Sequence, residues 1–179
     1  MGALKTAINV VLFRPLIPAN TGNIGRTCLG FGARLHLIRP LGFSLAERDI
    51  KRAGLDHWEH VDLTVHDDWR SFEETTLPAL GNAYLVSKRL KLGSTPIADA
   101  TFPPATGPGS AGVALVFGNE VDGLSGLEEE TRGSLPAVYL PMCEDAIRSY
   151  NLSNAVAMAV YEVNRQRQRG GPTAEGSTR

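Results

Sequence analysis

Three polar segments contain the side chains best suited to chemistry. The first covers residues 20–27 and reads Asn-Thr-Gly-Asn-Ile-Gly-Arg-Thr, which places Arg26 among small residues. A helix start offers free N–H groups and positive potential, and a guanidinium offers a planar fork of donors, so this segment suits a phosphate or another anion. An ordinary capped helix with one surface arginine explains the segment equally well.

The other two segments occupy positions at which ligands commonly bind. One follows an apolar strand that ends at Gly118, where a ligand can approach the backbone closely, and Glu120 comes next. In open parallel sheets ligands bind beyond the carboxyl ends of the strands, which favours a site here over an ordinary turn. The third polar segment places Ser149, Asn151 and further amide and hydroxyl side chains in the first turn of an apolar helix. One such side chain is enough for a cap, so the excess indicates ligand contact.

Alternating strands and helices must position these segments. Continuous apolar runs predict strands buried on both faces, and a period of 3.6 residues predicts amphipathic helices. Expected strands cover 7–13, 35–38, 63–65, 83–86, 113–117 and 137–140, and expected helices cover about 20–31, 45–52, 68–76 and 152–169. This order predicts an α/β fold whose parallel sheet has helices on both faces. We expect Asn20 or Thr21 to cap the first helix, Gly30 and Gly32 to end it, and residues 91–112 to form a long loop.

The composition indicates one domain without bulk basic character. The chain has 179 residues, 18 Lys and Arg against 19 Asp and Glu, and a pI near 6.4. That balance excludes nucleic-acid binding by bulk charge, for which a pI above about 9 is expected. Cys28 and Cys143 form no CxxC pair, and neither a secretory signal nor a membrane span is expected. We therefore expect a cytoplasmic protein with a single domain over residues 1–170 and a disordered tail over residues 171–179.

Several common cofactor and catalytic motifs are missing from the sequence. The glycines after the first strand form neither GxGxxG nor the complete phosphate-binding loop, which disfavours a nicotinamide cofactor and a nucleotide triphosphatase. No serine lies in a GxSxG, so a hydrolase is also disfavoured. Without HExxH or paired thiolates, we expect no metal, and we expect solvated surface positions for His57, His60 and His66.

In this order and spacing, the three polar segments resemble the SPOUT class of S-adenosylmethionine-dependent RNA methyltransferases. The resemblance extends from Ile8 to about Gln168. Within the class, the chain looks most like the bacterial members that methylate the ribose 2′-oxygen of the tRNA wobble nucleotide, cytidine or uridine 34. Three features carry this likeness: the lack of an extra RNA-binding domain, the Arg52-Ala53-Gly54-Leu55-Asp56 stretch, and the ending Arg-Ser-x-Asn-Leu-Ser-Asn-Ala-Val from Arg148. The chain departs from the class at Asn119 and Asp122, where many relatives have proline and a basic residue.

The resemblance implies a fold, a cofactor and partners. It implies a deep C-terminal trefoil knot, a homodimer with the first and last helices at its interface, S-adenosyl-L-methionine as cofactor and the tRNA anticodon stem-loop as substrate, with no metal and no membrane. Two alternatives stay open. One is a 2′-O-methyltransferase that acts on another tRNA or rRNA ribose, and the other is a non-catalytic RNA-binding protein with the same fold.

The resemblance also assigns individual residues. Cofactor contacts fall at Leu85, Gly118, Leu140 and Ser149. Arg26 matches the arginine often assigned to activating the 2′-hydroxyl, but an arginine is effectively always protonated, so we expect it to hold the ribose or its phosphate.

Further roles complete the expected catalytic set. Asn151 would orient the nucleotide, and Asn20 and Glu120 would brace the loops around Arg26. In a two-fold dimer, Arg26 and the basic end of the last helix would form a positive groove despite the net charge of −1.

Overall fold

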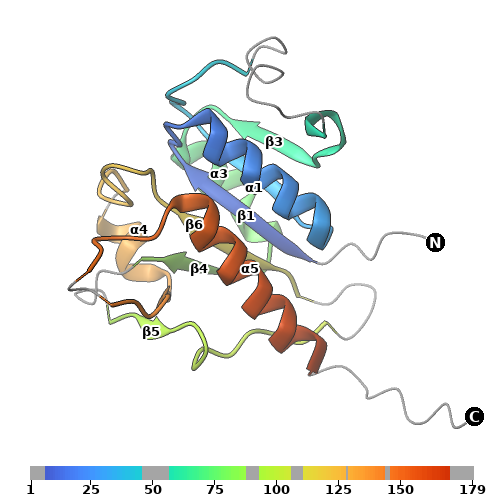
Figure 1. Cartoon of the computed structure of the whole chain (residues 1–179), viewed down its shortest axis with the longest axis vertical. Coiled ribbons are helices and arrows are strands. Elements are labelled where there is room, and N and C mark those ends of the chain that lie inside the picture. Colours follow the sequence, from blue (N-terminus) through green and yellow to red (C-terminus); the bar gives the residue numbers. More distant parts are fainter. Residues whose placement is uncertain are drawn as a thin grey trace, which may run out of the picture.

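The computed structural model describes residues 7–45, 57–87, 93–105, 111–127, 129–143 and 146–169. Within these ranges, seven parallel strands form one sheet in the order β3-β2-β1-β6-β4-β7-β5 (Figure 1). The strands are β1 (Ile8–Phe13), β2 (Arg34–Ile38), β3 (Leu63–His66), β4 (Asn82–Val86), β5 (Thr95–Pro96), β6 (Val113–Phe117) and β7 (Ala137–Tyr139). The parallel α/β sheet expected from the sequence is confirmed.

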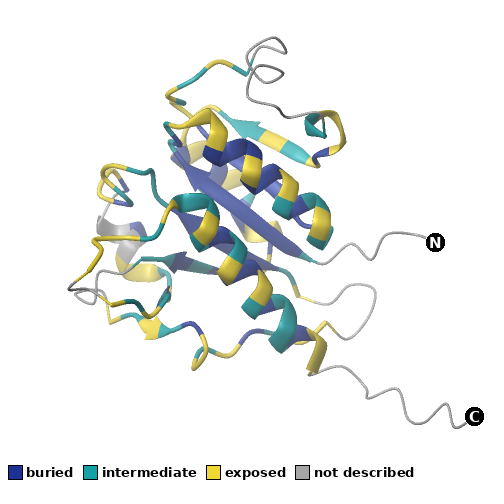
Figure 2. Ribbon diagram, viewed as in Figure 1, coloured by how far each residue is buried: buried dark blue, intermediate teal, exposed yellow. Residues whose placement is uncertain are grey.

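Helices cover both faces of this sheet. Helices α1 (Pro18–Phe31) and α5 (Leu152–Arg169) pack side by side over one face, and α3 (Trp69–Thr75) covers the other (Figure 1). Alternate side chains of β1 therefore enter two different cores. Val10 and Leu12 pack with residues of α1 and α5, whereas Val11 and Phe13 pack with residues of α3. Figure 2 shows the central strands buried beneath these helices.

Helix α1 begins earlier than its polar residues indicate. It starts at Pro18, and neither Asn20 nor Thr21 caps it, so the expected cap was wrong. Proline is favourable in the first turn of a helix, and a carboxylate from a distant loop takes the place of a local cap, as described below. Asn20 and Thr21 are consequently buried inside the helix. Gly32, with a φ of 62°, ends the helix as expected, whereas Gly30 lies inside it.

The segment expected to form one long loop contains a short edge strand. β5 pairs with β7 at the edge of the sheet, where a proline is tolerated because one side of the strand has no partner. Phe102 is buried and packs its ring against Tyr84, with ring centres 4.8 Å apart. A short helix that the sequence pattern did not predict, α4 (Glu129–Ser134), precedes β7. The helix expected at residues 45–52 lies, from residue 46 onward, outside the described residues, as do the Arg52–Asp56 stretch and the tail expected at 171–179.

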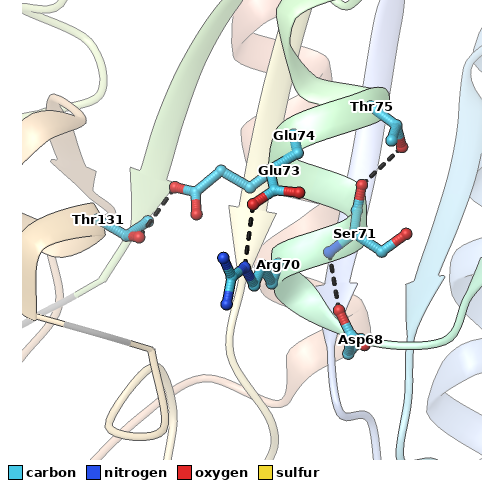
Figure 3. Close-up of polar contacts among 7 residues, drawn as sticks. All are labelled: Asp68, Arg70, Ser71, Glu73, Glu74, Thr75 and Thr131. Atoms are coloured by element: carbon cyan, nitrogen blue, oxygen red, sulfur yellow. Dashed lines mark hydrogen bonds and ion pairs between the residues drawn. The ribbon is translucent and has the colours of Figure 1, made fainter.

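Helix α3 is held by polar contacts at its start and along its length (Figure 3). The Asp68 carboxylate accepts a hydrogen bond from the Ser71 N–H at 2.7 Å, which caps the helix where the sequence predicts its start. The hydroxyl of Thr131, a buried residue of α4, donates to the Glu73 carboxylate at 2.9 Å. This contact joins α3 to α4 and thereby fixes the approach to β7.

The histidines are divided between the surface and the interior. His60 is exposed, as expected, but His66 is half-buried and stacks on His36, with its Nε2 3.0 Å from Nδ1 of that ring. Burial, and then the neighbouring His66, lower the pKa of the buried His36 to about 4. His57 is also half-buried. The expectation of a solvated surface is therefore wrong for His57 and His66. None of the helices in the described ranges is long and apolar enough to cross a membrane.

Candidate functional site

Three segments that are far apart in the sequence meet beyond the carboxyl ends of the strands. They are the first turn of α1, the loop of residues 118–127 that follows β6, and the start of α5. Asn20 Nδ2 donates to Glu120 Oε1 at 2.9 Å, and Asn151 Nδ2 donates to Asn20 Oδ1 at 3.0 Å. A chain of hydrogen bonds thus joins one residue from each of the polar segments.

Glu120 connects its loop to the backbone at the start of α1. Its Oε2 accepts from the Leu16 N–H at 2.9 Å, and its Oε1 accepts from the Ile17 N–H at 3.2 Å. The first N–H groups of a helix have no partner within the helix and carry partial positive charge, so a carboxylate is favourable at this point. Glu120 therefore supplies the cap that the local sequence of α1 lacks, and it holds the loop and the helix together.

The turn after β6 depends on close backbone packing. Asn119 and Gly123 exchange backbone hydrogen bonds at 3.1 Å in both directions, and the Asn119 side chain accepts from the N–H groups of Val121 and Asp122. A Cβ at Gly118 would overlap the backbone carbonyl of Gly123. Gly118 is therefore required for this turn, and Gly123, with a φ of 61°, adopts a conformation that favours glycine.

Asn151 has two roles at the start of α5. Its Oδ1 accepts from the Ser153 N–H at 2.9 Å and from the Ser153 hydroxyl at 2.7 Å, which caps the helix. Its Nδ2 is then directed to Asn20 of α1. The preceding Tyr150 donates its hydroxyl to the carbonyl of Pro141 at 3.0 Å, which ties the segment after β7 to the same helix start.

These segments enclose a cavity of about 550 Å³. Six of the residues expected at the site line it: Asn20, Gly118, Glu120, Leu140, Ser149 and Asn151. Apolar residues, among them Phe117, Leu124 and Leu152, complete the walls. A cleft that combines apolar walls with converging polar groups is typical of a small-molecule site.

Two of the expected site residues do not line this cavity. Leu85 is fully buried in the core under α3, and the next residues, Val86 and Ser87, line the cavity instead. Ser87 is the first residue beyond β4, so the rule that ligands bind past the carboxyl ends of strands would have selected it. Arg26 is exposed on α1, nearly two helical turns beyond Asn20. The cavity of a single chain therefore forms without Arg26.

Comparison with known proteins agrees with this architecture. The SpoU rRNA Methylase family matches residues 7–161. The tRNA (cytidine(34)-2′-O)-methyltransferase of Burkholderia ambifaria is 42% identical over 158 residues, which are 88% of this chain and 94% of that protein. A structure described as "Structural insights into the 2-OH methylation of C/U34 on tRNA" is 41% identical, with a TM-score of 0.73, and the match covers 89% of this chain and 95% of that one.

A more distant structure has the same fold. The SpoU methyltransferase AviRb from Streptomyces viridochromogenes, solved in complex with AdoMet, has a TM-score of 0.70 at 22% identity, and the match covers 91% of this chain and 58% of that one. The family match extends over most of the sheet and over all three segments that form the cavity. The protein belongs to the SpoU rRNA methylase family.

Proposed function

We propose that this protein transfers a methyl group from S-adenosylmethionine to the ribose 2′-oxygen of the tRNA wobble nucleotide, cytidine or uridine 34. The observation that carries this function is the 42% identity, over 94% of its length, to a relative whose name states the reaction. The cavity supports it, because six of the eight residues expected at the site line it at one edge of the sheet.

The residues of the cavity fit this cofactor. Its volume of about 550 Å³ lies within the usual range for small-molecule sites, about 300–1,000 Å³. Gly118, Leu140 and Ser149 line the cavity and would hold the cofactor, Gly118 through its backbone. The backbone at the end of β4, where Leu85 was expected to contact the cofactor, would contribute through Val86 and Ser87. When bound, the cofactor supplies a methyl group attached to a positively charged sulfur.

The chain must align the ribose hydroxyl and exclude competing water. Asn151 is held by its helix and by Asn20, and it would orient the target nucleotide at the mouth of the cavity. The hydrogen bond between Asn20 and Glu120 would hold α1 and the loop after β6 together as two walls of the cavity. Arg26 would hold the ribose or its phosphate and stabilise developing negative charge on the oxygen. The hydroxyl proton would pass to water or to a phosphate oxygen, because a guanidinium is not a base at neutral pH.

We infer that the active form is a homodimer with α1 and α5 at its interface. The outer face of α5 exposes two large apolar side chains, Met158 and Tyr161, the latter 60% exposed. A two-fold interface would bring the exposed Arg26 and Arg169 of each chain into one positive groove. Of the other arginines expected there, Arg167 is buried within its own chain and Arg165 pairs with Glu162. Such a groove binds anionic RNA locally even though the net charge is −1.

Three further features accompany this proposal. A C-terminal trefoil knot is supported by family membership and by the similar folds of the solved relatives. The family match over residues 7–161 supports a single domain within the expected bounds of residues 1–170. Because the substrate is tRNA, we place the protein in the cytoplasm, with no metal in the reaction.

The decisive experiment uses radiolabelled S-adenosylmethionine and bulk tRNA from a strain that lacks the enzyme. We expect label on the ribose of nucleotide 34, located by mapping of the modified tRNA. Label at another ribose would reassign the substrate position, and an absence of label in any tRNA would refute the catalytic function. Single-turnover rates of Arg26→Lys test the positioning role, because lysine keeps the charge but not the planar fork of donors.

A further inference from the structure

Arg14 has an unusual backbone conformation for its residue type. It is the one residue other than glycine with a positive φ in the described part of the chain, at 52°. Left-handed backbone is unfavourable for a residue with a long side chain, whereas glycine adopts it without strain. Strained residues of this kind concentrate at functional sites. The presence of arginine where glycine would fit better therefore calls for a contribution from its side chain.

Arg14 lies at the edge of the sheet where the candidate site forms. It is the first residue after β1, and its N–H donates to the carbonyl of Ile38 at 3.0 Å. Two residues later, the chain reaches the backbone that Glu120 binds. Gly126, near the end of the loop that forms one cavity wall, packs against Arg14, because a Cβ there would lie 3.1 Å from Nη1. Arg14 itself is not among the residues that line the cavity.

The guanidinium of Arg14 has no carboxylate partner among the described residues. Its Cζ lies 4.7 Å from the centre of the Phe13 ring, and its buried Nε has no hydrogen-bond acceptor. The terminal nitrogens make no hydrogen bond in the described structure. In contrast, four other arginines each form an ion pair with a carboxylate: Arg34, Arg39, Arg70 and Arg165. Arg14 is thus a positioned cation without a counter-charge from the chain.

We propose that Arg14 binds a phosphate group of the RNA substrate beside the cofactor cavity. The inference rests on the proposed function and adds a substrate contact to it. A guanidinium recognises phosphate through paired N–H donors, and the aromatic ring beneath it limits the orientations it adopts. RNA is favoured over the cofactor as the source of the anion, because Arg14 lies outside the cavity. The backbone strain at Arg14 is then retained for substrate binding.

Replacement by glycine separates binding from structure. Arg14→Gly relieves the backbone strain and removes the cation, so we expect a thermal midpoint equal to or above that of the unaltered protein, together with weaker RNA binding. The probe is a fluorescein-labelled RNA stem-loop with the anticodon sequence, titrated by anisotropy at salt concentrations from about 50 to 200 mM. We expect affinity at the lowest salt to fall about tenfold, and the slope of log K against log salt to decrease by about 0.7–1.

Two further variants complete the experiment. Arg14→Lys keeps the charge, so its salt slope should equal that of the unaltered protein while its affinity falls a few-fold through loss of the paired donors. Arg34→Gln is the matched control, because Arg34 is a surface arginine at the amino end of β2, whereas Arg14 follows the carboxyl end of β1. This variant should leave RNA affinity unchanged. Binding of S-adenosylhomocysteine, measured by calorimetry, should be the same in all four proteins.

Each contrary outcome has a distinct meaning. Equal RNA affinity and salt slope in Arg14→Gly and the unaltered protein would overturn the proposal while leaving the proposed function intact. Weaker binding of S-adenosylhomocysteine in Arg14→Gly would assign the side chain to the cavity and would also overturn it. If the unaltered protein fails to bind the stem-loop, the substrate assignment fails together with the role of Arg14.

Discussion

Removal of the Glu120 carboxylate is expected to weaken both the fold and the cavity. This side chain accepts hydrogen bonds from the backbone of Leu16 and Ile17 and from the Asn20 amide. Glu120→Ala leaves all three donors without their acceptor. The contact to Ile17 is exposed and that to Leu16 is partly buried, so water replaces the carboxylate there, whereas Asn20 is only 6% exposed and loses a partner in a buried position.

The expected loss of stability follows from these contacts. A lost cap destabilises by about 1 kcal/mol, and loss of a carboxylate from a helix start adds about 0.3–1 kcal/mol. A buried amide without its acceptor adds about 1–3 kcal/mol, so Glu120→Ala should lower the free energy of unfolding by about 2–5 kcal/mol. For a chain of this size the thermal midpoint should fall by roughly 5–20 °C. Glu120→Gln keeps one acceptor oxygen but no charge, and should lose about half as much.

Calorimetric unfolding measures this effect, and titration with S-adenosylhomocysteine measures the cavity. We expect ligand affinity to fall in Glu120→Ala because the loop that forms one wall is no longer tied to α1. Glu74→Ala is the matched control, since this exposed carboxylate pairs along its own helix with Arg70 and should change stability by less than about 0.5 kcal/mol. If Glu120→Ala unfolds within about 0.5 kcal/mol of the unaltered protein, the carboxylate does not cap the helix.

Three further predictions concern other parts of the molecule. The pKa of His36 is about 4 in the folded protein and near 6.5 in the unfolded chain, so the unfolded chain takes up a proton first as the pH falls. The free energy of unfolding should therefore decrease by up to about 3 kcal/mol as the pH drops from 6.5 to 4. Urea unfolding at both ends of this range measures the loss, and His36→Leu should lack this component. Arg167 is 2% exposed and donates to the carbonyls of Pro103 and Ala111 at 2.8 and 3.0 Å, so Arg167→Met should lower stability by about 2–4 kcal/mol in the same assay; an unchanged value would show that water replaces the guanidinium. Gly118→Ala must displace the Gly123 backbone and should reduce S-adenosylhomocysteine affinity at least about tenfold while the protein remains folded, which calorimetric titration and circular dichroism together would check.

Six of the seven strands, the principal helices and six of the residues that line the cavity could be predicted from the amino-acid sequence. Apolar runs such as Val113–Phe117 mark strands buried on both faces, and the regular apolar stripe of α5 marks the face that packs on the sheet. These patterns are reliable because burial acts on each element separately. Gly118, Ser149 and Asn151 were identifiable because their residue types are unusual at the positions they occupy.

Contacts between groups far apart in the sequence became visible in the folded chain. The start of α1 depends on Glu120, about a hundred residues further along the chain, and the bond between Asn151 and Asn20 joins residues 131 apart. The same holds for His36 and His66, which lie on neighbouring strands, and for Arg14, whose strain is visible only in its backbone angle. The periodicity of a sequence indicates which face of a helix or strand is apolar. The hydrogen-bond partner of a buried polar side chain depends instead on which distant segments pack against it.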